Sequence, residues 1–132
     1  MSFSADLRRF NRKTKDSLDR TRRIVIIKLF SAVIKDTPVL SGRLRGNWQT
    51  TINSPATGVI GIRDEAAAIA EVQRMAAQSK GSDVVILRNN LPYAYRIEFD
   101  GWSKVKAPQG MMRRNVARFQ RLLSEAVREG RL

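Results

Sequence analysis

The chain of 132 residues has the length of one domain, and its hydrophobic share of 42% and charged share of 28% are typical of a folded globular protein. It contains no cysteine and no histidine, which excludes disulfides and thiolate chemistry and removes the commonest general base and zinc ligand. Because 25 Lys and Arg oppose 12 Asp and Glu, the formal charge of +13 favours contact with a nucleic acid or with an acidic protein.

No stretch of the sequence has the apolar length of a signal peptide or of a membrane-spanning helix. The longest apolar run, Ile24–Ile27, is far too short to cross a bilayer. We therefore expect a soluble chain that is found in the cytoplasm and has no membrane partner.

The first predicted element is one long helix over residues 3–36. Apolar residues recur on one face with a period near 3.6, namely at Phe3, Leu7, Phe10, Leu18, Val25, Leu29 and Ala32. Asp6 lies in the first turn, where the helix dipole favours an acid, and Pro38 ends the helix at Thr37. Residues 24–34 are apolar on nearly every side, which predicts burial on more than one face. A strand over 24–30 is the competing prediction, since β-branched residues cluster there, but the flanking helical period disfavours it.

The first half of this helix is strongly basic. We take Arg8, Arg9, Arg12 and Lys13 as its candidate basic face. A solvated surface is the plainer interpretation, because no aromatic residue is interleaved to stack on bases. Another interpretation is that this half reaches a neighbouring subunit, so we expect residues 3–20 to exchange amide protons rapidly in free protein.

A turn and a strand follow the long helix. Ser41-Gly42 signals the turn, and residues 44–52 begin the first strand. Trp48 is expected to be buried. Arg43 and Arg45 lie beside the turn, and two interpretations stay open: they face a partner, or they serve the turn itself.

The middle of the chain predicts a hairpin, a helix and a central strand. Residues 53–58 form the hairpin loop, and Val59–Ile62 form a short return strand. Asp64 caps a helix over Glu65–Ser79, and Gly81 provides the left-handed residue after it. Residues 83–89 then read as a central strand.

An aromatic passage between Pro92 and Pro108 connects this strand to a last helix. Its aromatic residues provide large side chains that can pack in the core of the domain. Glu98 is expected to face solvent or to pair with Arg96. The last helix is predicted from Pro108 to about Glu129, with an apolar stripe at Met112, Val116, Phe119, Leu123 and Val127. Its outer face carries Arg113, Arg114, Arg118, Arg121 and Arg128.

These elements predict an α+β fold in a single domain spanning residues 1–132. A small antiparallel sheet of three to four strands packs with a long N-terminal helix, a middle helix and a C-terminal helix. The three parts are residues 1–36, residues 37–107 with the sheet and inserted helix, and residues 108–132.

The sequence contains few residues of the types that enzymes use for catalysis. The glycines fit no phosphate-binding loop or dinucleotide motif. A magnesium site built from Asp64, Glu98 and Asp100 is conceivable but disfavoured, because Asp64 is better explained as a helix cap. We therefore expect no cofactor, no metal and no enzymatic activity.

Two blocks of the sequence carry a family resemblance. They are Thr37–Trp48 and Asn90–Ser103, the second continued by Ala107–Arg113. In these blocks the chain resembles the tail-completion proteins of tailed bacteriophages, a family described as minor tail protein Z-like or as neck proteins of lambdoid phages. It departs from the family pattern at Phe99–Trp102, where an acidic residue is inserted after the aromatic one.

The resemblance implies a virion protein of the neck or tail, present in the host cytoplasm during assembly. It implies a ring around the DNA path, a hexamer or dodecamer, that completes the tail and joins it to the head. The implied partners are further copies of the chain, tail terminator and tail tube proteins, head connector proteins and, without sequence preference, packaged DNA. A tail terminator or a head–tail stopper ring is the related alternative. The candidate partner-interface residues are Arg43, Arg45, Tyr93, Tyr95, Glu98, Trp102, Arg113 and Arg114.

Two other functions remain open from the sequence. A basic nucleic-acid-binding protein would show binding that weakens steeply with salt, although no helix-turn-helix or RNA-binding aromatic motif is visible. A regulatory module that binds an acidic protein is the weaker alternative.

Overall fold

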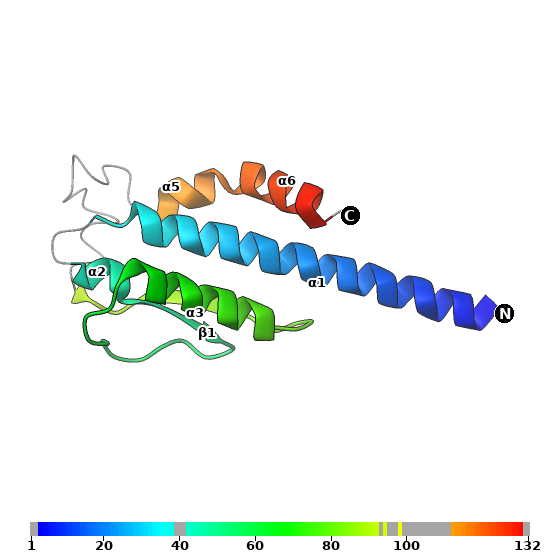
Figure 1. The fold of residues 1–132 in the computed structure, drawn as a ribbon, viewed down its shortest axis with the longest axis horizontal. Coiled ribbons are helices and arrows are strands. Elements are labelled where there is room, and N and C mark those ends of the chain that lie inside the picture. Colours follow the sequence, from blue (N-terminus) through cyan, green and yellow to red (C-terminus); the bar gives the residue numbers. More distant parts are fainter. Residues whose placement is uncertain (1–2, 39–41, 93, 95–97, 99–111, 131–132) are drawn as a thin grey trace.

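The computed structural model describes residues 3–38, 42–92, 94, 98 and 112–130. The elements are α1 (Phe3–Asp36), α2 (Arg43–Gly46), β1 (Trp48–Ile52), α3 (Glu65–Gln78), β2 (Val85–Asn89), α5 (Met112–Ala117) and α6 (Phe119–Gly130). The second half of α1 lies between α5 and α6 on one side and α3 with the sheet on the other, while its first half extends beyond them (Figure 1). The predicted mixture of helices and an antiparallel sheet is therefore confirmed.

Helix α1 has the bounds predicted from its apolar period, and the competing strand over residues 24–30 is excluded. Its C-terminal end is held by local hydrogen bonds. The Thr37 backbone N–H donates to the Ile34 carbonyl at 3.2 Å, and the Thr37 hydroxyl donates to the Val33 carbonyl at 2.8 Å. Pro38 follows and prevents the helix from continuing. The 34 residues give a helix about 51 Å long.

The sheet has fewer strands than predicted. The described residues contain a two-stranded antiparallel sheet in which β1 pairs with β2, with Trp48 opposite Asn89 and Ile52 opposite Val85. The predicted return strand at Val59–Ile62 is wrong. The Asn47 side chain explains this, because its amide donates to the Ile60 carbonyl at 3.3 Å and its oxygen accepts the Ile60 N–H at 3.0 Å. These two bonds occupy the backbone groups that a strand partner would use.

Helix α3 follows the prediction closely. The Asp64 carboxylate accepts the Ala67 N–H at 2.8 Å and so caps the helix, which ends at Gln78. Gly81, three residues later, has a φ of +53° and provides the left-handed turn into β2.

The core lies where α1, α3 and the sheet meet. Its buried members are Val33, Ile34, Leu44, Trp48, Ala68, Val72, Leu91 and Ala94, with Ile26, Ile27, Phe30, Ile69 and Leu87 packed against them. Residues 26–34 thus supply one side of α1 to this core, and the opposite side is covered by α5 and α6. Burial of the apolar half of α1 on two sides agrees with its sequence.

The last helix differs from the prediction in two ways. Its described part starts at Met112 and is interrupted at Arg118, whose N–H bonds the Asn115 carbonyl three residues back. The expected apolar stripe is also wrong in part, because Met112, Val116 and Leu123 are exposed. Polar groups make the specific contacts with α1 instead, such as Lys28 to Glu129 at 3.0 Å. The side chain of Val127 lies outside the described part of the molecule.

None of the helices among the described residues is long and apolar enough to span a membrane.

Candidate assembly surface

Arg45 is turned into the molecule and ties the end of α1 to the start of α3. Its guanidinium donates to the Thr37 carbonyl at 2.7 Å and to the Lys35 carbonyl at 2.9 Å, and pairs with Glu65 at 3.2 Å. It therefore serves the turn, and these contacts take up carbonyls that the end of α1 leaves without helical partners. Its neighbour Arg43 is exposed at the surface of α2.

Trp48 is buried, as predicted, with 3% of its surface exposed. Its indole N–H donates to the Thr37 hydroxyl at 2.7 Å, so the ring packs in the core while its polar atom is satisfied. Thr37, Arg45 and Trp48 thus form a structural corner between the end of α1 and the start of β1.

Glu98 is not on the surface. Only 5% of it is exposed, and its carboxylate accepts the backbone N–H groups of Met112 and Arg113, each at 2.8 Å. It also pairs with the Arg113 guanidinium at 3.2 Å. The expectation that Glu98 faces solvent is wrong, because the start of α5 needs an acceptor for its free N–H groups. The alternative partner Arg96 lies outside the described residues.

Arg114 joins α5 to the end of α1. It pairs with Asp36 at 3.4 Å, and the Asn115 amide donates to the same carboxylate at 2.9 Å. Arg113 and Arg114 were both candidates for contact with a partner, and the structure gives each of them a contact within the chain.

A second arginine network was not anticipated from the sequence. Arg63 donates to the Gly46 carbonyl at 2.7 Å and to the Trp48 carbonyl at 2.6 Å, and pairs with Glu71 at 3.2 Å. Glu71 also accepts the Thr50 N–H at 2.8 Å. The only sequence signal was a lone Arg between a loop and a helix cap, which carries no long-range information.

The environment of Glu71 sets its ionisation. Burial would raise its pKa, but the hydrogen bonds from Arg63 and Thr50 and the positive charges of Arg63 and Arg74 together hold the pKa below its usual value. At the turn before β2, a backbone hydrogen bond from Lys80 and a side-chain bond from Asn53 lower the pKa of Asp83 in the same direction.

The body of the protein holds α1 up to Arg22. The Arg22 guanidinium donates to the Asp83 carbonyl and to the Ser79 hydroxyl, the latter at 3.4 Å, and Thr21 is buried. Toward the N-terminus from this point most of the helix extends beyond the other elements (Figure 1). We call residues 3–20 the projecting half of α1.

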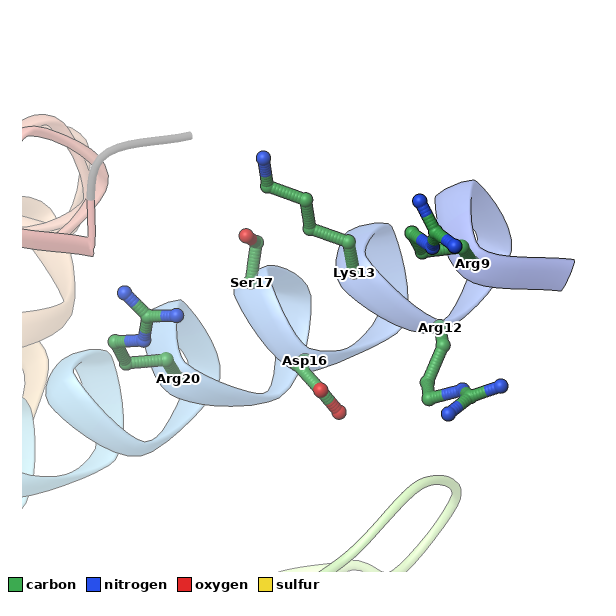
Figure 2. Close-up of a pocket in the computed structure, with 6 residues that line it drawn as sticks. All are labelled: Arg9, Arg12, Lys13, Asp16, Ser17 and Arg20. Carbon is green, nitrogen blue, oxygen red and sulfur yellow. The ribbon is translucent and has the colours of Figure 1, made fainter. Parts of the chain in front are cut away.

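The basic residues of the projecting half are exposed, as the sequence indicates. Arg8, Arg9, Arg12 and Lys13 all lie there. Figure 2 shows Arg12 and Asp16 on one side of the helix and Lys13 and Ser17 on another; with Arg9 and Arg20, these side chains line an open, mostly basic pocket along the helix.

An apolar stripe runs along the same projecting half. Leu7 is 45% exposed, Phe10 is 66% exposed and Leu18 is 56% exposed. With Thr14 between them, these residues share one helical face, because they follow each other at intervals of three or four. We call Leu7, Phe10, Thr14 and Leu18 the apolar stripe. The side chain of Phe3 lies outside the described part of the chain.

Three of the sequence candidates, Tyr93, Tyr95 and Trp102, lie outside the described residues, as does Asp100 of the disfavoured magnesium site. Asp64 and Glu98 each serve as a helix-start acceptor. Across the described ranges, no group of three or more acidic side chains is arranged to hold a metal ion.

In comparisons with family models, curated proteins and solved structures, no match to this chain was found.

Proposed function

We propose that the protein is a structural component of the neck or tail of a tailed bacteriophage. In this role it completes the tail and joins it to the head as one subunit of a ring, a hexamer or dodecamer, around the DNA path. It acts through surface complementarity and not through catalysis, and it is found in the virion.

The observation that carries this proposal is the projecting half of α1. A helix segment of 18 residues whose side chains are mostly exposed is only marginally stable in water. Its exposed Leu7, Phe10 and Leu18 add an apolar surface that a solitary protein would have little reason to keep uncovered. A subunit whose helix is completed by a neighbour accounts for both features.

The corner and cap residues support the same function. Arg45 and Trp48 in the first resembling block, and Glu98 in the second, fix the ends of α1, β1 and α5. The described residues of the two resembling blocks therefore hold the ends of these elements in fixed positions. A rigid body with a projecting helix is suited to an assembly in which each subunit must present its surfaces in fixed positions.

The basic face supports a contact with packaged DNA or with acidic neighbours in the tail terminator, tail tube or head connector. Six cations and three carboxylates lie in residues 3–20. Non-specific attraction to phosphates needs only such a surface, without base-reading side chains. DNA contact is thus part of the proposed role, and a separate nucleic-acid-binding function is the second candidate.

The experiment is electron microscopy of lysates from a phage in which this gene is deleted, compared with the same phage complemented by the intact gene. We expect full heads beside unattached or malformed tails, and normal virions on complementation. Tails of uncontrolled length would indicate a terminator, and heads that have lost their DNA would indicate a stopper. Normal virions without the gene would refute the proposal.

A further inference from the structure

We propose that the apolar stripe of the projecting half of α1 docks on a second copy of this chain, in the shallow groove along the outer face of α3. This inference rests on the ring in the proposed function and identifies the two surfaces that would form its contact. The groove is lined by Asp64, Glu65, Ala66, Ile69, Ala70 and Gln73. We call these residues, together with Ile62 two positions before Asp64, the acceptor surface.

The first argument is the continuity of the stripe with a helix contact that already exists. At the same spacing of three or four residues, the face of Leu18 continues through Thr21, Val25, Lys28, Ala32 and Asp36. Lys28 pairs with Glu129 of α6, and Asp36 pairs with Arg114 of α5. One face of α1 is thus covered by helices over its second half and left bare over its first. The bare part has the character of a helix-packing surface.

The second argument is that charge selects the acceptor. The cations of the projecting half flank the stripe, so a partner surface must be apolar and must not be basic. On α5 and α6, the exposed Met112, Val116 and Leu123 lie among arginines, which would repel the helix. The groove on α3 has no cation among its lining residues, and its Asp64 and Glu65 carboxylates, which also cap α3 and pair with Arg45, keep it from being basic.

The third argument is the shape of the acceptor surface. Ala66 and Ala70 are exposed and four residues apart on one face of α3, so a second helix can approach closely. Ile62 is 80% exposed, more than the other large apolar side chains of the described residues. It precedes the groove residue Asp64 by two positions in the sequence and is therefore included in the acceptor surface.

Two different surfaces that meet in this way form a heterologous contact. Each copy gives its stripe to one neighbour and its groove to another, which generates a closed ring when the rotation between copies is suitable. A contact of stripe against stripe would instead stop at a dimer.

The test uses two variants of the full chain, studied by sedimentation velocity over a range of concentrations. The stripe variant carries Leu7→Ser, Phe10→Ser and Leu18→Ser. The acceptor variant carries Ile62→Ser, Ala66→Lys and Ala70→Lys. Control variants change other faces of the same helices and keep the charges of α1: Arg8→Lys, Arg12→Lys and Lys13→Arg on α1, and Ala67→Lys with Gln78→Lys on α3. Circular dichroism checks that every variant keeps the folded body.

We expect the unaltered protein and both controls to self-associate, and each test variant to require at least a tenfold higher concentration. A mixture of the stripe variant with the acceptor variant should give a one-to-one complex, because one copy keeps an intact groove and the other an intact stripe. This complementation distinguishes a heterologous contact from a symmetric one.

Three results would overturn the inference: an unaltered protein that stays monomeric at about 100 μM, a test variant that associates like its control, or a mixture without the one-to-one complex. These outcomes are independent of the gene-deletion phenotype. If the phage without the gene is defective but the protein is monomeric, the neck role is supported and this contact is refuted. If the protein self-associates but the phage without the gene forms normal virions, the neck role is refuted and the contact is supported.

Discussion

Two arginines, Arg45 and Arg63, hold the corner between α1, β1 and α3 by donating to main-chain carbonyls. Arg45 binds carbonyls at the end of α1, and Arg63 binds those of Gly46 and Trp48 at the start of β1. Each also pairs with a glutamate of α3. A planar guanidinium with five donors suits this task better than a lysine, because it can serve several acceptors at once.

Gly46 tests how tightly this corner is packed. A Cβ at position 46 would collide with the Arg63 carbonyl oxygen, which belongs to the backbone and cannot rotate away. We expect Gly46→Ala to lower the free energy of unfolding by about 1–3 kcal/mol, as overpacking does elsewhere. Urea unfolding measures the change. Gly61→Ala, where a Cβ meets open space, is the control and should have little effect. Equal stability of the two variants would contradict the packing described.

The lowered pKa of Glu71 predicts a dependence of stability on pH. Since the pKa is lower in the folded protein, the carboxylate stabilises the fold above its unfolded pKa, and this contribution is lost as pH falls through the folded value. We expect Glu71→Gln to cost about 1–3 kcal/mol at pH 7, from its charged hydrogen bonds. The difference from the unaltered protein should shrink as the pH falls below the usual pKa of a glutamate and through the lower folded pKa.

Urea unfolding of both proteins at several pH values measures that difference, and Asp16→Asn on the projecting half provides the control. Asp83 has a lowered pKa in both proteins, so its effect cancels in the comparison. If the difference in free energy of unfolding between the two proteins does not shrink on acidification, that result would count against the ionic network.

At the level of elements, the sequence predicts those whose signals are local. The bounds of α1, the Asp64 cap of α3 and the left-handed Gly81 all depend on neighbouring residues, and all agree with the structure. The return strand failed because its backbone groups are taken by the Asn47 side chain, 13 residues earlier. Likewise Glu98 is buried by α5, whose first residue lies 14 positions later. Such pairings leave no periodic signal in the sequence.

The candidate site was predictable to a similar extent. The exposed basic residues and the amphipathic character of α1 follow from the helical period alone. The separation of α1 into a packed half and a projecting half does not, because it depends on where α3, α5 and α6 end along it. Arg45, Arg113 and Arg114 were candidates as surface cations, and their partners within the chain come from other elements.

The two halves of α1 are expected to differ in local stability. Residues 3–20 have few contacts outside their own helix, whereas residues 22–36 are held by α3, α5 and α6. In dilute, monomeric protein we expect amide exchange to be fast over residues 3–20 and slow over residues 24–36. Hydrogen exchange followed by mass spectrometry measures both in one experiment. Strong protection of residues 3–20 in a monomer would refute the prediction.

At the scale of the whole molecule, the excess of positive charge is divided between two tasks. Some of the positively charged side chains form ion pairs within the chain, among them Arg45, Arg63 and Arg114. The cations of the projecting half lie on exposed helix. The formal charge of +13 therefore overstates the surface that can meet DNA, and the projecting half contributes six exposed cations and three carboxylates to that surface.

This division predicts where DNA contact occurs. We expect Arg8→Ser, Arg12→Ser and Lys13→Ser together to weaken binding to double-stranded DNA and to reduce the slope of log K against log salt by up to about 3. Fluorescence anisotropy at several salt concentrations measures the slope. The stripe variant has the same number of serine substitutions and retains all cations, so its slope should be unchanged. An unaltered slope in the basic variant would exclude this face from DNA contact.

The length of the projecting half also has a geometric consequence for any assembly that it joins. Its 18 residues span about 27 Å, and a straight helix transmits that distance without bending. It would act as a rigid spacer that sets the distance between neighbouring subunits. In a ring, this distance sets the diameter of the central opening. Removing one heptad would shorten the spacer by about 10 Å while returning the stripe to nearly the same face. In the proposed ring, the width of the central opening would then change, while the residues that form the contacts stayed the same.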